Sequence, residues 1–232
     1  MRGEILGWLA AVEAEHARRE GDAELRTKVL ALKRYQQRRL EWTYRDLLAS
    51  SRYQEAARFF LVDLYGPVDF SQRDREFARI VPKIEALFPD QVLATVELLA
   101  RLHALSEELD SAMAQELEAL PIGPKAYVLA WGRVGRAQDR ERQLAWVIEL
   151  GAALERLTRH GWLVKTLKWM RGPARAVSLW ELQSFLERGL GSFRSMDGAR
   201  DFLALIERRE TELMTGLHQG QAWVLGELPR VG

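Results

Sequence analysis

The sequence predicts an all-α protein, built as a multi-helix bundle in one domain or in two packed sub-bundles. Apolar residues recur at helical spacing along almost the whole chain, whereas the period-two alternation of half-buried strands is nearly absent. The chain has 232 residues, of which 47% are hydrophobic and 29% are charged. This composition favours a folded chain with a substantial core, and the length suits one domain or two tightly packed halves.

The N-terminal half is expected to contain four helical stretches. Asp22 is suited to cap a long helix whose apolar residues share one face. Further helices are expected over residues 53–64, 71–88 and 90–120, and the last of these carries the longest regular pattern. The apolar face that follows Asp22 is formed by Leu25, Val29, Leu32, Leu40 and Leu47.

The segment PIGP, residues 121–124, is the best candidate for an internal boundary. Two prolines and a glycine cannot continue a helix. We therefore expect residues 1–232 to form a single helical domain with a sub-bundle boundary near residues 121–124. Beyond this segment, helices are expected over residues 125–137, 140–160, 162–171, 179–195 and 198–217.

The residue inventory excludes several kinds of site. The chain has no cysteine, which excludes disulfides, thiol nucleophiles and cysteine metal sites. Its net charge of +1 gives no overall attraction to nucleic acid or to membranes. The nucleotide motifs GxGxxG and GxxxxGK[ST] and the zinc-protease motif HExxH are absent. No cofactor is predicted, and the sequence favours a non-catalytic protein over an enzyme.

The N-terminal stretch does not read as a signal peptide. Its apolar run over residues 5–12 is short and lies between Glu4 and Glu13. Nothing later in the chain approaches the ~18 consecutive apolar residues of a membrane-spanning helix. We therefore expect a cytoplasmic protein without a membrane span.

The stretch FFLVDLYGPVDFSQRDREFARIVP, residues 59–82, is the least generic part of the chain. Gly66 and Pro67 are suited to end one helix, and Ser71 with Asp74 forms a capping-box pattern for the next. The polar residues around this corner predict a buried ionic cluster that fixes the angle between two helices, or an anion site at the start of the second helix. The residues in question are Asp63, Tyr65, Asp69, Ser71, Arg73, Asp74 and Arg79.

This block resembles one found in a family of uncharacterised bacterial helical proteins, in the form FFL-x-D-L-Y-G-x-x-D-F-S-x-R-D. The segments LHALSEELD, residues 102–110, and FLALIERRE, residues 202–210, also resemble that family. Together the three segments cover under a fifth of the chain. The resemblance implies a shared architecture and, because that family has no assigned activity, it implies no catalytic residues.

A polar stripe on the expected helix over residues 90–120 is the second candidate site. His103, Ser106 and Asp110 follow one another along one edge of its apolar face, and Glu107 lies beside them. The spacing of His103 and Glu107 lets both side chains reach one ion or one water, as in metal-binding bundles. The alternative is a partly buried histidine that is hydrogen-bonded to Asp110 or to a facing side chain. The other histidines, His16, His160 and His218, are expected at the surface or at helix ends.

A basic stretch over residues 156–175 contains no acidic residue, whereas the helix over residues 90–120 is mostly acidic. The two segments are predicted to pair within the fold or across a dimer interface. Alternatively, the basic stretch contacts phosphates of nucleic acid or an anionic surface. The basic residues are Arg156, Arg159, Lys165, Lys168, Arg171 and Arg175.

Three functions follow from these features. Tryptophan content and charge segregation favour a non-catalytic protein that binds a protein partner or itself, as in a homodimer. The second function is a helical protein that binds a metal or a small ligand through His103, Glu107 and Asp110. The third is a binder of nucleic acid or an anionic surface through the basic stretch, which no nucleic-acid-binding motif accompanies.

Overall fold

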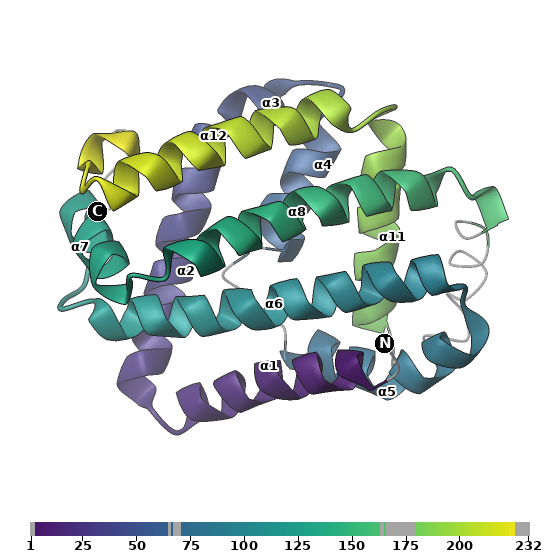
Figure 1. Cartoon of the computed structure of the whole chain (residues 1–232), viewed down its shortest axis with the longest axis horizontal. Coiled ribbons are helices and arrows are strands. Elements are labelled where there is room, and N and C mark those ends of the chain that lie inside the picture. The colour runs from purple at the N-terminus through teal and green to yellow at the C-terminus, as the bar shows by residue number, and fades with distance from the viewer. Residues whose placement is uncertain (1–2, 65, 67–70, 163–164, 166–179, 226–232) are drawn as a thin grey trace.

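The structure is a computed structural model, and it describes residues 3–64, 66, 71–162, 165 and 180–225 (Figure 1). Within these residues the regular elements are helical and none is a β-strand, which confirms the predicted all-α bundle. The helices form two layers, as most domains do when each helix buries one apolar side.

The first layer consists of four helices that lie roughly side by side, as Figure 1 shows. Neighbouring helices within it are in contact: α1 with α6, α6 with α8, and α8 with α12. From top to bottom in Figure 1 these helices are α12 (Arg200–His218), α8 (Ala137–Thr158), α6 (Asp90–Glu116) and α1 (Glu4–Glu20).

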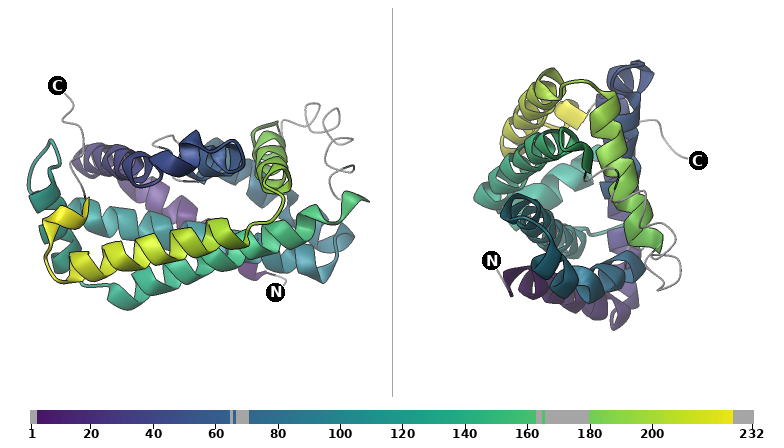
Figure 2. Two further views of the ribbon diagram at one scale, coloured as in Figure 1. Left: turned by 90° about the horizontal axis from the view of Figure 1, so that it is seen from above. Right: turned by 90° about the vertical axis from the view of Figure 1, so that its right-hand side faces the viewer.

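The second layer crosses behind the first at a steep angle, and Figure 2 shows the two layers from above. Its helices contact the first layer chiefly through α2 with α6 and α11 with α8. The layer comprises α2 (Ala23–Thr43), α3 (Arg45–Ala49), α4 (Gln54–Arg58), the π-helical η1 (Phe59–Leu64) and α11 (Trp180–Ser195). The remaining elements are α5 (Ser71–Leu87), α7 (Pro124–Val134) and the short 3-10 helix η2 (Ala222–Leu225).

Several expected helix boundaries are confirmed. Asp22 caps α2, since its side chain accepts a hydrogen bond from the Leu25 amide. The stretch 53–64 forms α4 and η1, and α5 matches the helix expected over residues 71–88. The helices expected over residues 179–195 and 198–217 correspond to α11 and α12. Most of the helix expected over residues 162–171 lies outside the described residues.

Other boundaries differ from the prediction. α6 ends at Glu116 and not near residue 120. The break between α7 and α8 falls at Gly135, whose φ of 61° lies in the left-handed region that glycine adopts without strain, so α8 begins earlier than expected. α1 was not assigned from the sequence, although Ile5, Leu9 and Val12 bury one side of it at helical spacing.

The helix α6 lies at the centre of the apolar core. Its apolar face includes Leu102, Leu109 and Met113, and all three are buried. Along its length α6 contributes to four separate groups of packed apolar residues. One is shared mainly with α2, α7 and α12, one with α8, α11 and α12, one with α1, α5 and α11, and a small one near its start with α8 and α11. A polar residue on α6 is therefore well placed to contact several helices at once.

Two adjacent aromatic residues of η1 belong to different parts of the core. The ring of Phe59 lies 5.4 Å from that of Phe185 on α11. The ring of Phe60 lies 6.0 Å from Phe193 and 5.9 Å from Phe202. Packing against α11 and α12 thus explains the two aromatic residues of the FFL stretch.

Candidate functional site

The polar stripe on α6 points into the protein and meets charged residues from three other helices. Glu107 is only 4% exposed, and its neighbours His103 and Asp110 are mostly buried. Burying charged groups is costly unless each is paired and hydrogen-bonded. The partners of these three residues therefore decide what the stripe does.

Glu107 is held by two cations. Lys33 Nζ of α2 lies 2.6 Å from Glu107 Oε1, and the Arg19 guanidinium of α1 bonds to Glu107 Oε2. Arg19 also donates to the Glu107 carbonyl at 2.5 Å and to Ser111 Oγ at 2.8 and 2.9 Å. Burial alone raises the pKa of Glu107, but Lys33, His103 and Arg19 outweigh it, and the pKa lies well below its ordinary value. Glu107 is therefore an ionised, charge-neutralised centre.

His103 is paired with a carboxylate from another helix. Its Nε2 lies 2.9 Å from Asp74 Oδ2 on α5, while its Nδ1 lies 3.9 Å from Glu107 Oε1, beyond hydrogen-bonding distance. Burial raises the pKa of Asp74, but the bond from His103 and the charge of Arg73 lower it further than burial raises it. An ionised Asp74 accepts, so the proton of His103 is assigned to Nε2.

Arg73 links this pair to the corner that follows η1. Its Nη1 donates to the Asp63 carbonyl at 2.8 Å, its guanidinium lies 3.4 Å from Asp74 Oδ1, and it stacks over Phe185 at 4.6 Å. The Asp63 carboxylate accepts from Arg188 of α11 at 2.6 and 2.9 Å. Three helices meet through these contacts, and Asp74 is directed into the interior.

The other corner residues are less informative. Ser71 is half-buried at the start of α5, and Arg79 is exposed. Tyr65 and Asp69 lie outside the described residues. The predicted anion site therefore stays a prediction, because part of it lies outside the described residues.

His16 was expected at the surface or at a helix end; it lies near the end of α1, but its side chain is largely buried. Its side chain is 14% exposed, and its Nε2 lies 3.8 Å from Glu107 Oε2. Burial lowers the pKa of His16 below its ordinary value of 6.5, although Glu107 and Asp74 act in the opposite direction. The signal was available in the sequence, since residues 5, 9, 12, 16 and 19 share one side of a helix.

Stability is expected to fall as the pH drops from about 7.5 to about 5.5, because the unfolded chain binds more protons than the folded one there. His16 contributes to this fall, because burial lowers its pKa in the folded protein below that of the unfolded chain. The lowered pKa values of Asp74 and Glu107 also make the protein less stable as the pH falls further. Burial raises the pKa of Asp110, which changes the stability in the opposite sense.

Urea unfolding at several pH values measures this effect. His16→Gln should flatten the dependence between about pH 7.5 and 5.5, whereas His160→Gln, at an exposed position, should leave it unchanged. An unchanged slope in His16→Gln would show that the buried imidazole is not its source.

The basic stretch does not pair with α6 in the part of the chain that is described. Arg159 pairs with Glu155 of its own helix at 3.2 Å, and Arg156 and Lys165 are exposed. The exposed Glu108 of α6 pairs instead with Arg136. Three further basic residues lie outside the described residues: Lys168, Arg171 and Arg175.

The described residues contain no group of three or more histidine and carboxylate side chains arranged to hold a metal ion. His103, Glu107 and Asp110 lie on one helix as predicted, but each is hydrogen-bonded to a residue of another helix: His103 to Asp74, Glu107 to Lys33 and Asp110 to Gln36. Glu107 in particular is already surrounded by cations, which a metal ion would have to displace. The chemistry of this donor set is that of an ionic network.

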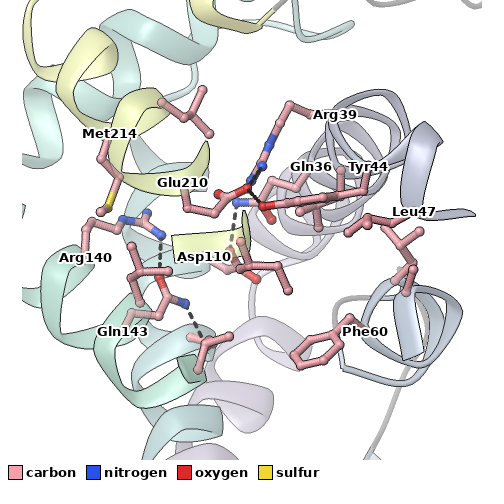
Figure 3. Close-up of a pocket in the computed structure, with 18 of the residues that line it drawn as sticks. Gln36, Arg39, Tyr44, Leu47, Phe60, Asp110, Arg140, Gln143, Glu210 and Met214 are labelled. Atoms are coloured by element: carbon pink, nitrogen blue, oxygen red, sulfur yellow. Dashed lines mark hydrogen bonds and ion pairs between the residues drawn. The ribbon is translucent and has the colours of Figure 1, made fainter. Parts of the chain in front are cut away.

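Beside this network lies a cavity of about 130 Å³, here called the central cavity (Figure 3). Residues of α2, α3, α4, η1, α6, α7, α8 and α12 line it. Asp110 Oδ1 accepts a hydrogen bond from Gln36 at 3.2 Å on one wall. Next to it, Gln143 of α8 donates to Ser106 at 2.8 Å and accepts from Arg140 at 3.3 Å. Polar groups from three helices thus meet at one interior space.

A second ion pair completes the polar wall. Glu210 Oε1 of α12 accepts from Arg39 at 2.5 Å and from the Tyr44 hydroxyl at 2.7 Å (Figure 3). Burial opposes the charge on Arg39, but Glu210 outweighs it and raises the pKa of Arg39. Burial raises the pKa of Tyr44 as well, which keeps its hydroxyl protonated and donating.

The remaining wall of the central cavity is apolar. Phe60 and Phe202 line it, together with Leu47, Val147 and Ile206. A space with charged groups on one side and aromatic and branched side chains on the other matches the general make-up of small-molecule sites.

A smaller cavity of about 50 Å³, here called the second cavity, adjoins the first. Gln36, Ser106 and Asp110 line both cavities, so their hydrogen bonds form the partition. The second cavity contains the Glu107 network on its other walls, with Lys33, Arg73, Asp74 and His103. The polar stripe of α6 therefore lies between the two cavities and borders both.

Sequence reasoning did not identify Arg39, Arg140, Gln143 or Glu210 as site residues. Each lies on a helix whose sequence shows a common pattern of charged residues. The four side chains come close together only because α2, α8 and α12 pack around the same cavity. One signal existed: Arg39 continues the spacing of Leu25, Val29, Leu32 and Tyr35, all of which are buried. A charged residue in register with an apolar face indicates a buried ion pair.

Among the described residues, no helix has the length and apolar character needed to cross a membrane.

Comparison with known proteins gives one match. The family described as "Domain of unknown function (DUF8198)" matches residues 15–224, a span that contains the block at 59–82, α6 and every residue that lines the central cavity. No curated protein and no solved structure matches the chain. The sequence resemblance pointed to an uncharacterised family, and the match agrees with it. The chain therefore belongs to the DUF8198 family of domains of unknown function.

Proposed function

We propose that the protein binds a small molecule in the central cavity. The observation that carries this proposal is an interior space of about 130 Å³ whose walls combine buried ion pairs with aromatic side chains. Protein interiors are close-packed and keep few voids larger than a water molecule. A cavity of this volume costs on the order of 3 kcal/mol in lost packing, which an occupant offsets.

The size of the cavity limits the ligand. Its volume is close to that of an engineered apolar cavity of roughly 150 Å³ that accepts benzene. The ligand therefore has on the order of ten non-hydrogen atoms or fewer. Its polar end faces Gln36, Asp110 and Arg140, and its apolar end packs against Phe60 and Phe202.

Saturation-transfer NMR with a mixture of small aromatic fragments tests the proposal. Ala57 is buried and lines the cavity, so Ala57→Leu fills the space and should abolish the transfer. Ala145→Leu, on the exposed side of α8, is the matched control and should keep it. If no fragment shows transfer, or if Ala57→Leu leaves it intact, the central cavity is not the site.

Self-association is a second candidate function, favoured by one observation. Trp223 of η2 is 75% exposed and Leu129 of α7 is 57% exposed, and η2 packs against α7. Large apolar side chains that gather at one end of a molecule are typical of an interface. Sedimentation velocity of wild type and Trp223→Ser tests for a dimer: a concentration-dependent dimer that the variant loses supports this candidate, and a monomer at all concentrations contradicts it.

A further inference from the structure

A further interior space, here called the third cavity, has apolar walls. Its volume is about 100 Å³, and residues of η1, α6, α8 and α11 line it together with Phe88, which lies between α5 and α6. Leucine, valine and phenylalanine make up most of its lining, and none of the described residues in it is charged. Leu64, Leu99 and Phe185 also line the second cavity, so an apolar partition separates the third cavity from the Glu107 network.

Water is a poor occupant of this space. Among the described residues of the lining, Thr95 supplies the one polar side-chain atom, and its hydroxyl already donates to the Gln91 carbonyl of the same helix at 2.9 Å. A buried water typically makes about three hydrogen bonds to polar groups, and cavities without such groups stay dry. The third cavity is therefore suited to an apolar group.

The π-helical element η1 borders two of the cavities. Phe59 and Leu64 line the third cavity, whereas Phe60 and Leu61 line the central cavity. π-helical turns are rare and occur frequently at functional sites. One short element thus supplies walls to two spaces of different character, one partly polar and one apolar.

An unfilled apolar cavity lowers stability in proportion to its volume, because the side chains around it lose packing contacts that an occupant restores. The third cavity is smaller than the roughly 150 Å³ that accepts benzene, which limits the occupant to about four to six carbons. We propose that the third cavity is a second binding site, which takes an alkyl group of this size, either a free hydrocarbon or the end of a longer chain.

Methyl NMR spectra of the protein labelled at leucine and valine test this proposal with n-pentane. Pentane should shift the methyl signals of residues that line the third cavity, such as Val92, Val96 and Leu154, in a saturable way. The signals of Leu25 and Val29, which pack in a different part of the core, should stay unchanged. Pentane-1,5-diol has the same chain with a hydroxyl at each end and should cause no such shift at the same concentration, because apolar walls leave its hydroxyls without partners.

Val96→Leu enlarges a side chain of the lining and takes up part of the space. It should weaken pentane binding by about threefold or more and raise the urea concentration at the midpoint of unfolding. Ala94→Leu, on the exposed side of α6, is the control and should change neither quantity. A lower midpoint in Val96→Leu would mean that the space is already filled by the protein, and it would contradict the proposal.

Heptanoate distinguishes the two sources of the alkyl group, because its carboxylate has to remain in water. If heptanoate shifts the same methyl signals as pentane, the cavity takes the end of a longer chain; if pentane alone does so, the occupant is a free hydrocarbon. The proposal fails if neither probe shifts these signals, or if the diol binds as tightly as pentane.

The third cavity can be tested independently of the proposed function. Ala57 lines the central cavity and not the third, so Ala57→Leu should leave the pentane shifts of Val92 and Val96 intact. Their loss in that variant would place the pentane in the central cavity and contradict a second site. Their persistence, whatever the outcome of the fragment experiment, supports it.

Discussion

Glu107→Gln is expected to lower the free energy of unfolding by about 3–5 kcal/mol, because it leaves buried cations without their counter-charge. The substitution preserves side-chain shape, so the loss measures charge and not volume. Lys33 and Arg19 both bond to this carboxylate, and Glu107 is almost fully buried. Equilibrium unfolding in urea measures the difference.

The neighbouring residue provides a matched control. Glu108 is exposed and pairs with Arg136 at the surface, so Glu108→Gln should cost less than about 1 kcal/mol. The double variant Lys33→Met, Glu107→Gln removes one of the cations left unpaired and should lose less than the two single variants added together. Equal costs at positions 107 and 108 would show that the ionic network does not act as a buried unit.

Phe59→Ala is expected to cost about 3–5 kcal/mol, because it removes a buried ring from a packed cluster. Phe59 is 4% exposed, and its ring contacts Phe60 and Phe185. It also lies against Gly189, where a β-carbon would come within 2.8 Å of the ring. The space around Phe59 is therefore shaped to this side chain.

Val62→Ala is the control within the same short element. Val62 is 52% exposed, and its truncation should change the free energy of unfolding by no more than about 0.5 kcal/mol. Similar, small costs for both variants would mean that the FFL stretch does not anchor the fold. A large cost at Phe59 alone would support packing as the reason for the aromatic residues there.

The helices could be predicted from the sequence because their signals are local. The Asp22 cap, the proline and glycine segment at 121–124 and the spacing of apolar residues on α6 each lie within a few turns of one helix. Where boundaries were missed, as at Gly135, the deciding feature was the local conformation of a single glycine.

The candidate site could be predicted only in part. His103, Glu107 and Asp110 were recognised because they share one helix, but their partners come from elsewhere in the chain. Lys33 is 74 residues away from Glu107 in sequence, and Arg39 is 171 residues away from Glu210. Local spacing does not reveal which charged side of a helix another helix will cover, so ion pairs between distant helices require the packed structure.

The same limit applies to the central cavity. Its walls come from eight helical elements, and the cavity is the space that their side chains leave unfilled. Periodicity indicates which residues face inward, as it did for Leu102 and Met113, but it carries no information on residual volume.

The π-helical geometry of η1 has a consequence for the tolerated length of the chain. Phe59 and Phe60 are consecutive, yet their rings pack into different parts of the core. The packing of each ring therefore fixes the angle between the two side chains around the helix axis. Deleting or inserting one residue between α4 and Leu64 turns the side chains on one side of the change about the helix axis and removes one ring from its place. Length variants should therefore be accepted at the turn after Gly135, where the chain reverses at the surface, and rejected within η1.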